Sequence, residues 1–165
     1  MRLRSLKRVF ISFTTMLILM SMLFSQHPNT NYLYAVGDDG DVLVYMPRDG
    51  SSGASLIGSL GVANVEATAL SLDGQSLYAA NANILGTLNW NTGVFTAVGG
   101  TFGTGGGSVG EISLSDVDGL AFDPLTGTFY GTHRYSDGSP EDLLFQINPS
   151  TGAHVPNAFG SGLDY

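Results

Sequence analysis

The chain has 165 residues, including 23 glycines and no cysteine, and its formal net charge is −8. Without cysteine it can form no disulfide, thiolate metal site or thiolate nucleophile. Four of its six basic residues lie among the first eight, so residues 27–165 carry two basic and 14 acidic side chains, a net charge of −12. Such a surface repels phosphate backbones and anionic membranes, and we expect no nucleic-acid partner.

Residues 1–26 predict a signal peptide. Four basic residues precede an apolar run of 16 residues, Val9 to Phe24, interrupted only by hydroxyl side chains. That length fits the apolar segment of a signal peptide and is shorter than the roughly 20 residues of a spanning helix. We therefore expect a secreted, extracellular or periplasmic protein without further membrane insertion. An uncleaved N-terminal anchor is the alternative.

Residues 31–66 form the first of three similar units. Two apolar runs, Tyr32–Val36 and Val42–Tyr45, flank the sequence Gly-Asp-Asp-Gly-Asp. An Asp-Gly pair between apolar runs predicts a β-hairpin, because its tight turn needs positive φ angles. Ser55–Leu60 is a further predicted strand.

The hairpin turn also raises the question of calcium. Asp38, Asp39 and Asp41 supply three carboxylates within four residues, and calcium prefers oxygen ligands. The spacing is not that of an EF-hand, and no glutamate follows at the position where that motif needs one. A plain turn and a calcium site are compatible here, and the sequence predicts no other cofactor.

Residues 67–115 and 116–165 form the second and third units. In both, an apolar run and an aspartate-containing turn precede an aromatic run and a Thr-Gly turn; residues 68–73 match 118–123, and 76–79 match 128–131. The runs are too short for helices and suit strands. The predicted strands are 67–72, 76–80, 84–89 and 94–98, followed by 117–122, 128–132, 143–148 and 154–159. Gly99 to Gly110 is a glycine-rich insertion that we expect to be flexible and to bury little.

Repeats of about 40–50 residues with four antiparallel strands each favour an all-β fold of β-propeller blades over a plain antiparallel sandwich. Tyr34, Tyr78 and Tyr130 recur at one repeat position, which predicts a place in the core. The first unit lacks its opening strand, and three units are fewer than the 4–8 blades of a closed ring. We expect an incomplete ring that either belongs to a longer protein or self-associates through its open blade edges.

The sequence of residues 120–131, Leu-Ala-Phe-Asp-Pro-Leu-Thr-Gly-Thr-Phe-Tyr-Gly, resembles the blade repeat of exported bacterial β-propellers. Residues 145–152 are similar to the partner strand and turn of that repeat. The resemblance is to the NHL, YVTN and quinoprotein-dehydrogenase-like groups, and it extends over residues 31–165. It implies a propeller architecture. It implies no particular activity, because such blades serve enzymes, adhesins and binding scaffolds alike.

The strongest candidate for ligand contact is the polar loop that begins at His133. Within it His133, Arg134 and Asp137 combine an imidazole, a cation and an acid; a solvated turn is the alternative. Residues 105–110 satisfy both Gly-x-Ser-x-Gly and Gly-x-Gly-x-x-Gly, but neither motif predicts a site without a strand before it and a helix after it. Trp90, at a predicted turn, could stack on a sugar or cover a neighbouring blade.

These observations predict an exported, non-catalytic scaffold or binding module with a protein or glycan ligand. The alternative is the N-terminal part of a propeller hydrolase, lyase or dehydrogenase whose catalytic residues lie in blades outside this sequence.

The leader gives the first testable prediction. When the gene is expressed in a bacterial host, the exported product should begin near His27, which N-terminal sequencing or intact mass can establish. A cytosolic product that retains Met1 would contradict export.

Overall fold

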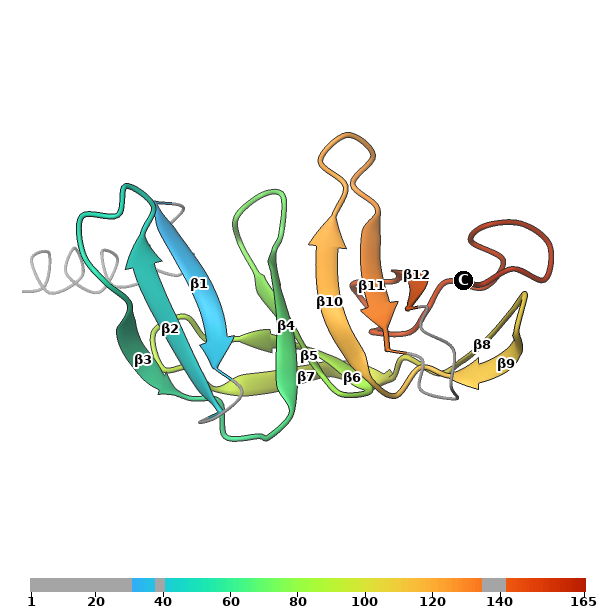
Figure 1. Cartoon of the computed structure of the whole chain (residues 1–165), viewed down its shortest axis with the longest axis horizontal. Coiled ribbons are helices and arrows are strands. Elements are labelled where there is room, and N and C mark those ends of the chain that lie inside the picture. The colour runs from blue at the N-terminus through green and yellow to red at the C-terminus, as the bar shows by residue number, and fades with distance from the viewer. Residues whose placement is uncertain (1–30, 38–40, 135–141) are drawn as a thin grey trace, which may run out of the picture.

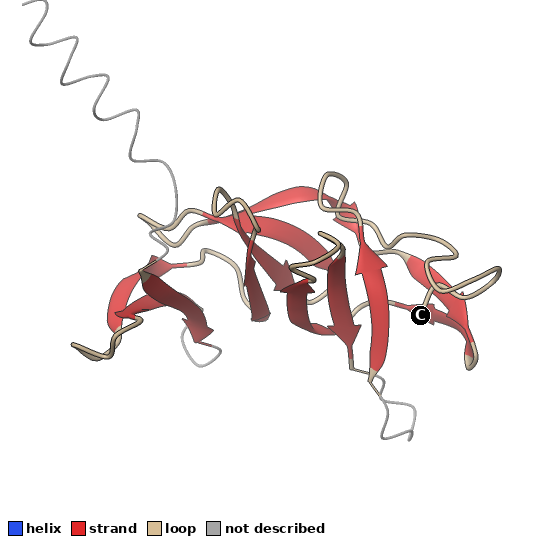
Figure 2. Ribbon diagram, turned by 90° about the horizontal axis from the view of Figure 1, so that it is seen from above, coloured by secondary structure: helices blue, strands red, loops and turns tan. Residues whose placement is uncertain are grey.

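The computed structural model describes residues 31–37, 41–134 and 142–165, and these are all-β. Twelve strands form four small antiparallel sheets (Figure 2). No helix in the described residues is long and apolar enough to cross a membrane. Figure 1 shows the three larger sheets following one another along the long axis, with a small hairpin near the C-terminus.

The first sheet contains β1 (Tyr32–Gly37), β2 (Val42–Pro47) and β3 (Ser55–Ser59). The antiparallel pairing of β1 with β2 confirms the predicted hairpin, and Tyr34 lies opposite Tyr45. The second sheet contains β4 (Val65–Leu70), β5 (Leu77–Asn81), β6 (Ile84–Leu88) and β7 (Phe95–Thr101), in chain order. All four strands predicted for the second unit are therefore present.

The third sheet contains only three strands, β10 (Val117–Phe122), β11 (Phe129–His133) and β12 (Leu143–Ile147). The predicted strand at 154–159 is wrong, since only a single bridge joins Ile147 to His154 and turns follow it. The local sequence explains the difference. Pro156 has no N–H for a ladder, and Asn157 adopts a positive φ of 57° that a regular strand does not allow.

The glycine-rich insertion is more ordered than its composition indicates. Its first residues extend β7 to Thr101, and the rest forms the hairpin of β8 (Thr104–Gly107) and β9 (Gly110–Ser113). Phe102, between β7 and β8, is completely buried. The expectation that this segment buries little is wrong for Phe102 and Gly105, whereas its other residues are exposed or half-buried.

The second and third sheets repeat one register. Leu70 pairs with Leu77 in the second sheet, and Phe122 pairs with Phe129 in the third. The turn after the first strand of each sheet is closed by an equivalent backbone hydrogen bond. The N–H of Ser71 donates it in the second sheet, and the N–H of Asp123 donates it in the third. Ser71 therefore takes the place of Asp123, and the expected match of 68–73 with 118–123 is wrong by two residues. A slip of two keeps each side chain on the same face, so the sequence pattern does not reveal it.

The central strand β5 of the second sheet is buried on both faces, as its alternate residues show. Leu77 and Ala79 belong to an apolar cluster with the first sheet, whereas Ala80 belongs to a cluster with the third. The expectation that the three tyrosines form the core is only partly met. All three are half-buried, and Tyr130 stacks on Phe159 at 6.5 Å outside both clusters.

Each Thr-Gly turn contacts the last strand of the preceding sheet. The side-chain oxygens of Asn89 and Asn148 accept backbone N–H bonds within the two turns, which fixes their shape. The carbonyl oxygen of Thr92 lies against Gly58, and that of Thr151 lies against Gly99. A Cβ atom at either glycine would overlap that oxygen. Half-buried Trp90 lies in the first of these turns, as predicted.

Two neighbouring glycines of β7 test this contact. A methyl group at Gly99 would overlap backbone atoms of the Thr151 turn, whereas one at Gly100 meets nothing within 4 Å. Gly99→Ala should lower the free energy of unfolding by about 1–3 kcal/mol, as overpacking does. Gly100→Ala, the matched control, should change it by less than about 1 kcal/mol. Equal effects in urea denaturation would show that the sheets do not meet at Gly99.

Candidate functional site

The candidate site lies where the first strands of the second and third sheets begin. Both strands contain a one-residue irregularity, at Glu66 between Val65 and Ala67 and at Asp118 between Val117 and Gly119. An extra residue of this kind bends the strand and changes the direction of its side chain. The two bulges occupy the same position in the repeat, and each carries a carboxylate.

Arg134, directly after β11, joins these carboxylates. Its Nη2 lies 3.1 Å from Oδ2 of Asp118 and 3.4 Å from Oε2 of Glu66, and its Nη1 lies 3.6 Å from Oδ2 of Asp116. We call these four residues the Arg134 cluster. It links two sheets, since Glu66 belongs to β4 and Asp118 to β10.

The cluster is partly open to solvent. The Arg134 side chain is 52% exposed, and the Asp118 side chain is 19% exposed. The nearby carboxylates, Asp116 first, then Asp118 and Glu66, raise the pKa of Arg134. Its guanidinium therefore stays charged and acts as a hydrogen-bond donor without a role in proton transfer. Exposed ion pairs of this kind contribute little to stability.

The buried side chain of His133 supports the cluster from the interior of the protein. It is the only buried polar or charged residue in the described part of the chain, with 5% of its surface exposed. Its Nδ1 lies 3.1 Å from both the backbone nitrogen and the carbonyl oxygen of Asp116, so it accepts from that N–H or donates to that carbonyl according to its tautomer. The Asp116 carbonyl also accepts the N–H of Arg134 at 2.9 Å. Thr132 adds a bond of 2.9 Å from its hydroxyl to Oδ1 of Asp118.

The residues predicted to contact a ligand therefore lie in different environments in the structure. Arg134 lies at the surface, and His133 is an interior residue that orients Asp116. Asp137 lies outside the described residues. The sequence analysis missed Glu66 and Asp118, and the signal that could have found them is one acidic residue at the same repeat position in two units.

Of the predicted calcium ligands, Asp38 and Asp39 also lie outside the described residues. Asp41 has a positive φ of 45°, as a tight hairpin turn requires, and its carbonyl accepts the N–H of Leu60 at 2.7 Å. No group of three His, Asp or Glu side chains suited to a metal ion occurs in the part of the chain that the structure describes.

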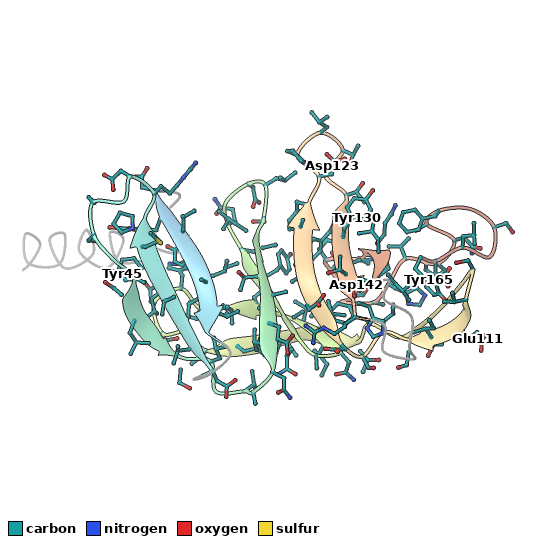
Figure 3. All side chains as sticks on the ribbon, viewed as in Figure 1. Tyr45, Glu111, Asp123, Tyr130, Asp142 and Tyr165 are labelled. Carbon is teal, nitrogen blue, oxygen red and sulfur yellow. The ribbon has the colours of Figure 1, made fainter. Side chains whose placement is uncertain are left out.

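A second polar group joins residues 153–165 to the small hairpin. The Asp164 carboxylate accepts the N–H of Asn157 at 2.6 Å and that of Gly106 at 2.8 Å, and it lies 3.6 Å from Nε2 of His154. The Tyr165 hydroxyl donates to the Gly110 carbonyl, and its ring fills the space that a side chain at Gly107 would need. Figure 3 shows Tyr165 beside this hairpin, on which Glu111 is also labelled.

The same hairpin contains the Gly-x-Ser-x-Gly sequence. Residues 106 and 107 belong to β8, residue 110 begins β9, and the serine lies in the two-residue turn between them. A nucleophile elbow requires a helix after the serine, and here a strand follows. The motif is therefore a hairpin turn, and the glycines of the overlapping dinucleotide motif serve its packing against Tyr165.

Comparison with known proteins gives no matching family model and no matching curated protein. The class of the protein thus rests on its own fold, an all-β chain of small antiparallel sheets.

Asp164 gives a prediction about pH. The hydrogen bonds from Asn157 and Gly106, with His154 contributing, hold the pKa of Asp164 below its ordinary value of 3.8. The folded-state pKa of Asp164 is therefore lower than its unfolded-state pKa. The stability that the ionised carboxylate contributes is fully present at pH values above the unfolded-state pKa, and it is lost as the pH falls through the folded-state pKa.

Asp164→Asn should therefore lower the free energy of unfolding at pH 7 by about 1.5–3 kcal/mol, the range for hydrogen bonds to a charged group. The difference from wild type should shrink as pH falls below about 4. Urea titrations at several pH values measure both effects, and exposed Asp142→Asn is the control. A difference that persists unchanged at low pH would contradict the assignment.

Proposed function

We propose that this chain is an exported, non-catalytic binding module built from β-propeller-type blades, and that its Arg134 cluster binds the hydroxyl groups of a glycan. The repeated register supports the blade assignment, because two sheets share their strand order, their bulge and their turn closure. The first strands β4 and β10 also lie next to one another, as the innermost strands of consecutive blades would (Figure 1).

The Arg134 cluster is the observation that carries the ligand proposal. It places guanidinium donors between carboxylate acceptors on a partly exposed surface, at ion-pair distances of 3.1–3.6 Å. A sugar hydroxyl both donates and accepts, so it can bond to both kinds of group at once. The strongly acidic surface of residues 27–165 argues against a polyanionic ligand and favours a neutral glycan.

In this proposal the charged groups of the cluster hold a ligand by hydrogen bonds and carry out no chemistry on it. Arg134 stays charged, and the imidazole of His133 is buried with its Nδ1 engaged by the Asp116 backbone.

The test is binding of the exported protein to a panel of immobilised neutral and acidic glycans. Arg134→Gln should weaken binding to the preferred neutral glycan roughly tenfold to hundredfold, since charged hydrogen bonds contribute about 1.5–3 kcal/mol. Arg48→Gln removes the only other cation of residues 27–165 and is the matched control.

Unchanged binding by Arg134→Gln would contradict the site. A protein that binds no glycan of the panel, or only acidic ones, would contradict the ligand class. Glycan hydrolysis or lyase cleavage during the assay would overturn the non-catalytic assignment.

A further inference from the structure

The outer face of the third sheet, which points away from the second sheet, is the surface next to the Arg134 cluster. The residues of β11 and β12 that are buried between the two sheets are Phe129, Phe145 and Ile147. Side chains alternate between the two faces of a strand, so Tyr130 and Thr132 of β11 lie on the outer face. Their partners in β12, Gln146 and Leu144, share that face.

The Arg134 cluster continues onto this face through Thr132. The Thr132 hydroxyl donates to Oδ1 of Asp118 at 2.9 Å, and Nη2 of Arg134 lies 3.1 Å from Oδ2 of the same carboxylate. Tyr130 (Figure 3) lies four residues before Arg134, a distance of roughly 13 Å at the rise of a strand. One sugar ring bound at Arg134 is too short to reach Tyr130, whereas an oligosaccharide can contact both.

Tyr130 forms an accessible aromatic surface together with Phe159. Their ring planes are inclined by 28°, and their centroids lie 6.5 Å apart. Phe159 belongs to the segment after β12 and is 42% exposed, and Tyr130 is half-buried. The C–H groups on one side of a sugar ring are apolar, so their contact with aromatic rings removes apolar surface from water. The hydroxyl groups of the same sugar ring can stay in water or bond to neighbouring polar side chains.

The equivalent face of the second sheet shows what contact with a further sheet requires. Ala80 is paired with Leu85 there, and both are completely buried in the cluster shared with the third sheet. Thr132, paired with Leu144, holds the same place in the third sheet. Thr132 directs its hydroxyl to Asp118, and Leu144 is 48% exposed. The outer face therefore combines polar and apolar groups, which suits a ligand that has both hydroxyl groups and apolar C–H surface.

We propose that the glycan of the Arg134 cluster is an extended oligosaccharide, and that Tyr130 and Phe159 bind a second of its sugar rings by stacking. This inference rests on the proposed function and specifies the ligand of the same site. Sugars joined by equatorial bonds, as in cello-oligosaccharides, form a straight chain that can follow β11 from Arg134 to Tyr130. The axial bonds of malto-oligosaccharides make the chain curl. The equatorial hydroxyl groups of the straight chain also leave C–H groups on the ring faces, where they can contact aromatic rings.

Calorimetric titration of the exported protein with cellobiose and cellotetraose tests the proposal. Cellotetraose should bind about tenfold more tightly, because only the longer chain reaches from Arg134 to Phe159. Maltotetraose, which contains the same sugar in the other linkage, should lack this gain. Phe159→Ala should abolish the difference between cellotetraose and cellobiose and leave the affinity for cellobiose unchanged. Phe159→Tyr, which keeps an aromatic ring, should preserve the difference.

Leu125→Ala is the matched control for the loss of an exposed apolar side chain. Leu125 is 93% exposed in the turn between β10 and β11, so its removal should leave every affinity unchanged. Urea denaturation of the Phe159 variants shows whether they are folded under the conditions of the titration.

Arg134→Gln separates this inference from the proposed function, because it should weaken the binding of cellobiose and cellotetraose alike. If binding depends on Arg134 but not on chain length or on Phe159, the stacking surface is wrong and the Arg134 site stands. Equal binding of maltotetraose and cellotetraose would contradict the extended ligand. Failure of both cello-oligosaccharides to bind would overturn this inference, and the glycan panel then decides the proposed function. Self-association that Phe159→Ala abolishes, measured by light scattering, would place a second copy on this face and would likewise overturn the proposal.

Discussion

The close approach of backbone to backbone between consecutive sheets is the constraint on which the rest of this structure depends. Thr92 carbonyl meets Gly58, and Thr151 carbonyl meets Gly99, at separations that leave no room for a Cβ atom. The side chains of Asn89 and Asn148 accept N–H bonds within these turns and so fix the shape of the surface that meets the preceding sheet. The apolar clusters then form at the spacing that these contacts set.

This stacking explains where polar groups gather. Both faces of the central strand β5 are buried in apolar clusters, and the charged side chain of the second sheet, Glu66, lies at a bulge near the start of β4. Glu66 and Asp118 occupy two such bulges, and the side-by-side position of β4 and β10 brings them within reach of one arginine. The candidate binding surface is thus a consequence of the repeat, in which one bulge recurs in neighbouring sheets. A groove lies between the first and second sheets, where no described strand pairs with the edge of β1 opposite β2.

Much of the fold could be predicted from the sequence, since short apolar runs separated by Asp-Gly and Thr-Gly turns determine strand positions locally. Three features could not. The order of the glycine-rich insertion depends on the burial of its own Phe102 and on contact with Tyr165, a distant partner that composition does not reveal. The strand expected at 154–159 is replaced by turns that Asp164 stabilises from seven residues away. Of the site, Arg134 was predictable as a rare cation in a polar loop, but its partner Glu66 lies 68 residues earlier and becomes a neighbour only through sheet stacking.

The central claim is that the sheets are packed into one cooperative unit and are not independent hairpins joined by linkers. Native-state hydrogen exchange tests it most directly, because it reports the opening free energy of each amide. The account predicts that the slowest amides of β4, β5, β10 and β11 share one free energy, equal to that of global unfolding. If the second and third sheets instead exchanged with clearly different free energies, the contact between Gly99 and the Thr151 turn would not couple them, and the account would be contradicted.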